Sequence, residues 1–177
     1  MAALDEPIFL AYHNPRWFDY YATEAVRISA CLPAADIVVE HIGSTAVPGL
    51  VAKPIIDVMI GTKQSNNLPE VRAALVTLGY EDFGEAGVPG RIYFRKRDGQ
   101  AFNVALVECD GNHWKSNLAI RDFLRANPGA VQEYAEIKAA AIQQGLRSLL
   151  AYSDFKSPFI TKLMREALAL KHQKMAS

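Results

Sequence analysis

The sequence has few cysteines, no excess of either charge and no long hydrophobic run. Its two cysteines belong to no CxxC motif, so we expect both thiols to be structural and reduced, as in a cytoplasmic protein. Lys plus Arg and Asp plus Glu are 19 each, which argues against extended nucleic-acid binding, because that function needs a domain-wide basic excess. The apolar stretches are far shorter than a membrane span of about 20 residues, and the early acidic residues predict no signal peptide.

The size and composition predict one globular domain. With 177 residues, of which 50% are hydrophobic and 21% charged, the chain can build a core without a disulfide or metal. A chain of this length buries about two-thirds of its unfolded surface. The sequence contains no internal repeat, low-complexity tract or linker, so we predict a single domain over residues 1–177.

Local patterns predict a helix, two strands, a second helix, a β-hairpin and then three helices. Apolar residues at three- and four-residue steps mark the first helix, which follows Pro15 and ends near Cys31. β-branched residues mark strands at 36–42 and 53–61, and Asp98-Gly99 is typical of the turn between hairpin strands 91–97 and 100–108. The other helices are expected at residues 68–78, 114–126, 128–145 and 158–171. This order predicts an α+β fold.

Three of these helices are expected to start where a capping side chain precedes proline. The three pairs are Asn14-Pro15, Asn127-Pro128 and Ser157-Pro158. Alternation in the second hairpin strand separates two sets of side chains, with Phe102, Val104 and Leu106 on one face and Asn103, Ala105 and Val107 on the other. The basic residues 95–97 beside the hairpin turn are expected to be solvated and to protect a sheet edge.

The densest group of unusual residues lies between residues 40 and 57. A strand ends at Gly43-Ser44, Thr45 adds a second hydroxyl, and a small-residue loop leads past Lys53 to a strand that contains Asp57. Gly43 would let backbone amides approach a phosphate, and the hydroxyls would donate hydrogen bonds to it. Asp57 interrupts an apolar strand, so its charge must be paired, hydrogen-bonded or placed in a polar pocket. The alternative is a pair of ordinary turns and a buried, purely structural Asp57.

Residues 40–57, EHIGSTAVPGLVAKPIID, closely resemble the signature of the GrpB family, which is placed in the nucleotidyltransferase (DNA polymerase beta-like) superfamily. A second block, comprising residues 118–128, Tyr134, Lys138, Tyr152 and residues 156–160, is similar to the family's C-terminal helical signature. The resemblance covers about residues 8–170, with a helical part at about 114–172. It implies a mixed sheet with helices on one side and a C-terminal helical layer, and Tyr134 and Tyr152 are expected to be packing residues.

The resemblance also implies a site for Mg²⁺ and a nucleotide. Active nucleotidyltransferases hold two Mg²⁺ ions with two acids at positions i and i+2 of one strand and a third acid on a neighbouring strand. In this sequence Asp57 fits the first acid, but Met59 stands at i+2, and Asn103 and Ala105 occupy the hairpin strand. Since the acidic triad is incomplete, we expect at most one metal ion.

Asp57 is the residue we expect to be catalytic and to bind that metal. The residues expected to help it are His41, Asn103 or Glu40. Since Glu40 and His41 alternate in facing along the strand, only one of them is expected to point toward Asp57.

An anion pocket is a further expectation. Lys53, Arg91 and Arg121 could converge around a phosphate, since guanidinium groups give bidentate contacts to such anions. Gly43, Ser44 and Thr45 complete the expected ligand-binding set. For Arg121, a structural ion pair with Asp122 is an equally open interpretation.

Two classes of function remain open on these residues. One is binding of a nucleotide or other phosphorylated small molecule at the Gly43-Ser44 turn, with Mg²⁺-dependent nucleotidyl transfer as its catalytic form. The other is a non-catalytic ligand-binding or protein-interaction module that has lost the metal-binding acids. Fold resemblance alone does not decide whether the protein is an enzyme.

Overall fold

A five-stranded mixed sheet forms the centre of the computed structural model, which describes residues 4–32, 36–63 and 68–176. The strands are β1 (Ile37–Ile42), β2 (Ile56–Thr62), β3 (Glu81–Asp82), β4 (Arg91–Lys96) and β5 (Phe102–Glu108). Their order across the sheet is β1-β2-β5-β4-β3, and β2 pairs in parallel with β5 while the other neighbours are antiparallel. The α+β prediction and the hairpin prediction are both confirmed.

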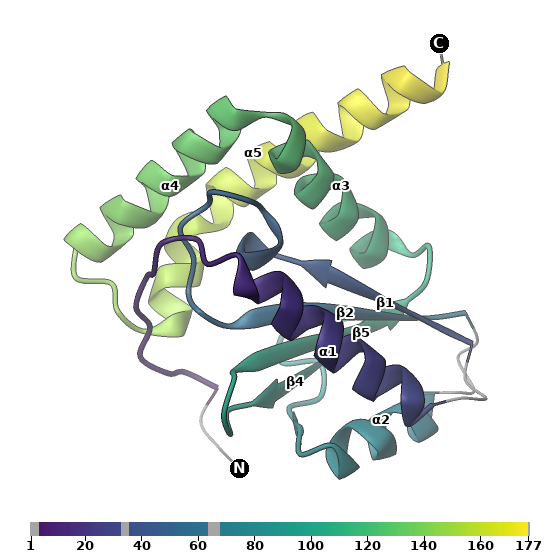
Figure 1. Ribbon diagram of the computed structural model, residues 1–177. Helices are drawn as coiled ribbons and strands as arrows, with labels where there is room; N and C mark the ends of the chain where they lie inside the picture. The colour runs from purple at the N-terminus through teal and green to yellow at the C-terminus, as the bar shows by residue number, and fades with distance from the viewer. Residues whose placement is uncertain (1–3, 33–35, 64–67, 177) are drawn as a thin grey trace.

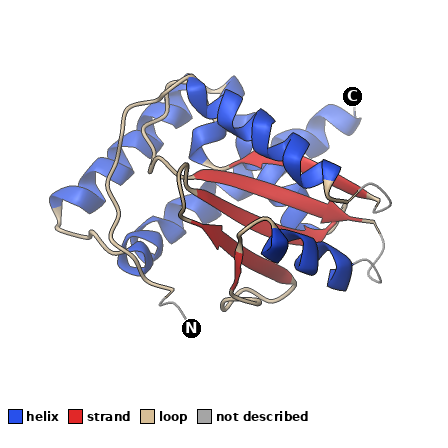
Figure 2. Cartoon of the chain, turned by 60° about the horizontal axis from the view of Figure 1, so that its bottom comes forward, coloured by secondary structure: helices blue, strands red, loops and turns tan. Residues whose placement is uncertain are grey.

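Helices cover both faces of this sheet, as Figures 1 and 2 show. The helices are α1 (Arg16–Ala30), α2 (Leu68–Thr77), α3 (Asn112–Ala126), α4 (Pro128–Gln143) and α5 (Leu149–Ala176). α1 and α2 pack on one face through a core that includes Ile60, Phe94 and Val104. α3 packs on the other face, and α4 and α5 join it in a helical layer. Among the described residues, no helix is long and apolar enough to cross a membrane.

A glycine in β2 lets α3 approach the sheet closely. A Cβ added at Gly61 would lie 2.6 Å from an aromatic carbon of Trp114, which is far inside van der Waals contact. Trp114 is 6% exposed and packs with Met59 and Val107 on the same face. This packing holds the start of α3 against the face of the sheet that carries Asp57.

One predicted helix start is wrong. α5 begins at Leu149 and contains Pro158 in its interior, so Ser157-Pro158 does not start a helix. A proline removes one N–H donor from a helix, but packing can offset that loss. Here Phe159 and Leu163, which follow the proline, are buried against α3 and α4.

The other two helix starts lie where we expected them. Asn14 Oδ1 accepts a hydrogen bond from the Arg16 amide, 3.1 Å away, at the start of α1. Asn127 precedes α4, but its side chain donates to the Phe123 carbonyl at the end of α3.

The prediction of a solvated basic run beside the hairpin turn is wrong for Arg95 and Lys96, whereas Arg97 is exposed as expected. Arg95 is 4% exposed, and it hydrogen-bonds the Leu4 carbonyl of the N-terminal segment. Lys96 donates to the buried carboxylate of Glu24, 3.2 Å away, on α1. The physical reason is tertiary: segments distant in sequence cover these side chains and supply their partners.

Candidate functional site

The turn after β1 brings the backbone against Asp57. Gly43 has a φ of +69° and a ψ of −168°, a region that is essentially restricted to glycine and costs other residues about 1–3 kcal/mol. A Cβ added there would lie 2.5 Å from Asp57 Oδ2. Only glycine therefore allows the turn to approach this carboxylate so closely before the chain enters the short 3₁₀ helix Ser44–Ala46.

Asp57 is held by a hydrogen-bond network. Asn103 lies opposite it in the register of β2 and β5, and its Nδ2 donates to Asp57 Oδ1 at 2.7 Å. Asn103 Oδ1 accepts from the Tyr93 hydroxyl and from an Arg97 nitrogen, both at 2.9 Å. Arg97 is fixed in turn by Glu6 at 2.7 Å. Since arginine only donates and an ionised carboxylate only accepts, Asn103 must turn its amide nitrogen toward Asp57 and its oxygen away.

A cavity of about 140 Å³ opens beside Asp57, and we call it the lysine cavity. Its walls include Gly43, Ser44, Thr45, Asp57 and the three lysines Lys53, Lys138 and Lys156. The strand and turn supply the carboxylate and hydroxyls, while α4 and α5 supply two of the lysines. Helices at the far end of the chain therefore complete a site that starts at the β1–β2 connection.

Lys138 is the most deeply buried of these lysines, with 1% of the residue exposed. Its Nζ donates to Ser44 Oγ and to the Val51 carbonyl, each at 2.6 Å, and lies 4.2 Å from the centre of the Tyr134 ring. Burial lowers the pKa of Lys138 well below its usual value of 10.5. Lys138 thus joins α4 to the Gly43-Ser44 turn.

Lys156 and Lys53 are desolvated in the same cavity. Burial, together with repulsion from Lys53, lowers the pKa of Lys156 from 10.5 to about 8, although attraction to Asp57 opposes the change. Burial likewise lowers the pKa of Lys53. Lys156 Nζ lies 4.1 Å from the centre of the Tyr152 ring. An anion entering this cavity would relieve the electrostatic cost of holding these amines close together.

A second cavity, of about 250 Å³, lies on the other side of Asp57, and we call it the arginine cavity. It shares Gly43 and Asp57 with the lysine cavity, and its other walls include Arg91, Tyr93 and Asn103. The Asp57 carboxylate is therefore within reach of molecules in either cavity.

The structure divides the residues expected to form one anion pocket. Lys53 lines the lysine cavity and Arg91 lines the arginine cavity, while Arg121 lines neither. One nitrogen of Arg121 lies 2.6 Å from a Glu40 oxygen, and its Nε lies 2.8 Å from Asp122. The ion-pair interpretation of Arg121 is the one this geometry supports.

His41 is not brought to Asp57. Asp57 pairs with Ile42 across β1 and β2, so the neighbouring His41 faces the opposite side of the sheet. Its ring stacks on Tyr21 of α1, with centroids 4.6 Å apart, and its Nε2 is 3.0 Å from Thr45 Oγ1. Burial and nearby arginines lower the pKa of His41 to about 3.

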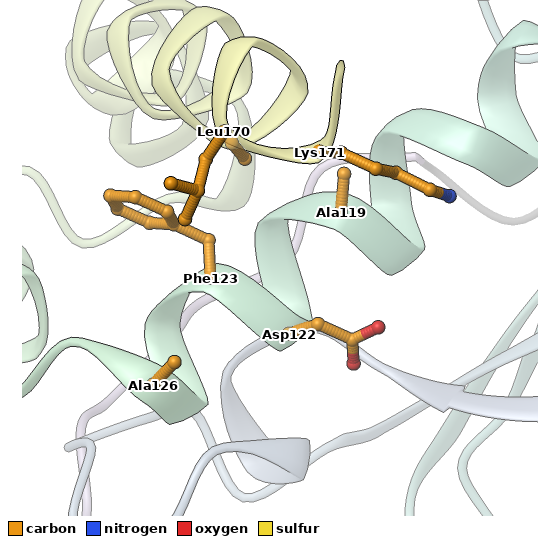
Figure 3. Close-up of a pocket in the computed structure, with 7 residues that line it drawn as sticks. Ala119, Asp122, Phe123, Ala126, Leu170 and Lys171 are labelled. Atoms are coloured by element: carbon orange, nitrogen blue, oxygen red, sulfur yellow. The ribbon is translucent and has the colours of Figure 1, made fainter. Parts of the chain in front are cut away.

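A third cavity, of about 200 Å³, lies between α3 and the C-terminal part of α5 (Figure 3). Its walls are mainly apolar and include Phe123 and Leu170, with Asp122 and Lys171 beside them. It shares no lining residue with the lysine or arginine cavity.

Comparison with known proteins supports the resemblance found in the sequence. A family model described as GrpB protein matches residues 7–166. The chain belongs to the GrpB family. A UPF0157 protein of Streptomyces coelicolor is 34% identical over 164 residues, which cover 93% of this chain and 86% of that protein. A UPF0157 protein of Bacillus subtilis is 31% identical over 149 residues, covering 84% of this chain but 43% of that protein.

Solved structures agree with this assignment. The crystal structure of conserved protein GrpB from Enterococcus faecalis has a TM-score of 0.83 and 32% identity, covering 92% of this chain and 99% of that one. Terminal uridylyl transferase 4 from Trypanosoma brucei, with bound UTP, has a TM-score of 0.52 and 18% identity over 92% of this chain and 53% of that one. That second likeness shows a shared nucleotidyltransferase-like fold and nothing further.

The residues of this GrpB-family chain do not fit a resident Mg²⁺ ion. Mg²⁺ requires near-octahedral oxygen ligands, but Met59 offers a thioether and Asn103 presents an N–H toward Asp57. Glu40 is paired with Arg121, so Asp57 is the carboxylate that remains, and three lysines line the cavity beside it. Within the described part of the chain, no group of three or more His, Cys, Asp or Glu side chains could hold a metal ion.

Sequence reasoning did not place Lys138 and Lys156 in the lysine cavity of this GrpB-family protein. Both belong to the C-terminal block that resembles the family signature, but their spacing in the sequence gives no reason to place them at Gly43-Ser44. One available indication was chemical: each lysine lies four residues after a tyrosine, Tyr134 or Tyr152, on a helix, so the two side chains share a face. The structure shows those tyrosines packed beneath the amines.

Proposed function

We propose that this GrpB-family protein binds a nucleotide or similar phosphorylated small molecule, with its phosphate groups in the lysine cavity. The observation that carries this proposal is the convergence of Lys53, Lys138 and Lys156 on the Gly43-Ser44 turn. Three amines face one carboxylate there, and burial holds their pKa values down. A polyanion would supply the missing negative charge and would find hydrogen-bond donors already in place.

The size of the lysine cavity limits which part of the ligand it can hold. A volume of about 140 Å³ is close to that of a cavity that holds one benzene molecule, about 150 Å³. It therefore suits a phosphate chain, and the nucleoside would lie outside it. The nucleotide bound by the Trypanosoma brucei enzyme supports this class of ligand through the shared fold.

Thermal unfolding tests the proposal. Wild-type protein would be heated with each of the four ribonucleoside triphosphates and with tripolyphosphate, in the presence and absence of Mg²⁺. At a ligand concentration of 100 Kd, binding stabilises the folded state by about 2.7 kcal/mol, which raises Tm by about 5–10 °C for a domain of this size. If no ligand raises Tm at millimolar concentration, the proposal is wrong.

Matched variants assign the effect to the lysine cavity. Lys156→Met removes one amine from the cavity, whereas Lys115→Met removes an exposed amine from α3. We expect Lys156→Met to weaken triphosphate binding at least about tenfold, equivalent to about 1.4 kcal/mol. Lys115→Met should bind like wild type. Equal affinity for all three proteins would place the binding site elsewhere.

Two forms of this function differ in their dependence on Mg²⁺ and Asp57. Nucleotidyl transfer with Mg²⁺ at Asp57 predicts an activity that Asp57→Asn abolishes. A ligand-binding module without catalysis predicts metal-independent binding and no transfer. The buried Met59 and the amide orientation of Asn103 favour the second form, because neither side chain offers oxygen to a cation at Asp57.

A further inference from the structure

The arginine cavity contains a half-buried arginine that no carboxylate of the described residues contacts directly. Arg91 enters from β4, and its guanidinium carbon lies 5.1 Å from the centre of the Tyr93 ring. Over the described ranges Arg91 forms no ion pair, and its buried Nε has no hydrogen-bond partner. Burial lowers the pKa of Arg91, although attraction to Asp57 opposes that change. A guanidinium in this situation is suited to an anion that supplies two oxygen acceptors.

Acceptor groups surround the rest of the arginine cavity. Asp57 has one oxygen engaged by Asn103, which leaves Oδ2 for another donor. Asn117 donates from Nδ2 to the His113 carbonyl at 2.8 Å, so its carbonyl oxygen remains an acceptor. His113 directs Nε2 at the Pro89 carbonyl, 2.8 Å away. Since that carbonyl only accepts, Nε2 carries a hydrogen, which leaves Nδ1 as the ring nitrogen that can accept.

These groups define the chemistry of a ligand. The single guanidinium of Arg91 can pair with one anionic group. The three acceptors, on Asp57, Asn117 and His113, can bind hydroxyl or ammonium donors of the same molecule. A multiply charged phosphate chain is disfavoured here because one cation would face it and Asp57 would repel it, whereas the lysine cavity provides three amines. A volume of about 250 Å³ admits about ten non-hydrogen atoms, by comparison with benzene in about 150 Å³.

We infer that the arginine cavity binds a small carboxylate that also carries a hydroxyl or ammonium group, such as a hydroxy acid or an amino acid. Its carboxylate pairs with Arg91, and its donor groups face Asp57, Asn117 and His113. Because Gly43 and Asp57 line both cavities, this ligand would meet the phosphorylated ligand at the Asp57 carboxylate. Contact between the two ligands rests on the proposed function, whereas binding of the carboxylate alone does not.

Ligand-observed NMR titration tests the inference with three probes: lactate, L-serine and 1,2-propanediol. Lactate and serine carry the carboxylate and a donor, and propanediol replaces the carboxylate of lactate with a neutral alcohol. We expect lactate or serine to saturate the wild-type protein below about 10 mM, while propanediol does not bind in that range. Arg91→Ala should weaken the binding at least about tenfold, and Arg91→Lys should restore part of it because it keeps the charge but not the bidentate geometry.

Control variants separate this inference from the proposed function. Arg165→Ala removes an exposed arginine from α5 and should leave carboxylate binding unchanged. Lys156→Met should weaken triphosphate binding and leave carboxylate binding intact. Carboxylate binding without triphosphate binding would overturn the proposed function alone.

Three results would overturn the inference itself. The first is that neither carboxylate binds the wild-type protein, and the second is that propanediol binds as well as lactate. The third is that a folded Arg91 variant, checked by circular dichroism, binds the carboxylate as tightly as wild type. If Arg91→Ala does not fold, the same comparison is made with Arg91→Lys, for which unchanged affinity would be equally damaging.

Discussion

Lys156→Met should make this protein more stable while weakening its binding of phosphates. Lys156 is partly buried in the lysine cavity, where burial and repulsion from Lys53 lower its pKa from 10.5 to about 8. A lowered lysine pKa means that folding is opposed whenever the amine is protonated in both states. Methionine has a similar length and no charge, so it removes that opposition.

The magnitude follows from the two pKa values. A lowering from 10.5 to about 8 corresponds to about 3 kcal/mol of destabilisation at pH 7, where the amine is charged in both folded and unfolded chains. The gain in the free energy of unfolding on substitution should be smaller than this, about 1–3 kcal/mol, because the methionine thioether makes poorer contacts than an amine in a polar cavity. Above pH 8 the folded protein loses the proton before the unfolded chain does. The gain should therefore shrink between pH 8 and pH 10.5.

Urea unfolding of wild type and Lys156→Met at pH 7 and pH 10 measures this difference. Groups far from the lysine cavity titrate alike in the two proteins, so their contributions cancel in the comparison. Lys53 and Lys138, whose charges interact with that of Lys156, are relieved of repulsion by the substitution, which adds to the gain in stability at pH 7. Lys115→Met, which removes an exposed amine, should change stability by less than about 0.5 kcal/mol at either pH. A Lys156→Met gain that is absent at pH 7, or that is the same at both pH values, would refute the argument that a desolvated amine destabilises this cavity.

Three further predictions concern the turn, the buried histidine and the packing of α3. Gly43→Ala should lower the free energy of unfolding by at least about 1–3 kcal/mol because of its backbone conformation, and by more because of the contact with Asp57. Adding Asp57→Ala should recover only the second part in urea unfolding. The pKa of His41 is about 3 in the folded protein, so below pH 6.5 the unfolded chain binds a proton that the folded protein does not. The free energy of unfolding should therefore fall by about 2 kcal/mol from pH 7 to pH 5. The fall should be smaller in His41→Gln, which lacks the titrating group. Gly61→Ala should lower Tm by several degrees because its Cβ would enter the space of Trp114, and an unchanged Tm would show that α3 can move away from the sheet.

Local chemistry made most of the fold predictable. The Asp98-Gly99 turn specified the hairpin, and strand alternation correctly placed Phe102, Val104 and Leu106 in one core. The same alternation put Asn103 on the other face, and the register then set it opposite Asp57. The start of α5 was not predictable in this way, because Pro158 is tolerated inside the helix by packing that depends on α3 and α4.

The sequence by itself determined the elements, the family resemblance and the special nature of residues 43–57, because turn chemistry, strand periodicity and motif residues are local properties of the chain. Only the tertiary structure decided which cations meet Asp57. It brought Lys138 and Lys156 to Ser44, assigned Arg91 to a separate cavity and engaged Arg121 with Glu40. The physical reason is that a buried charge needs partners close in space, and those partners come from helices and strands whose packing no local pattern encodes.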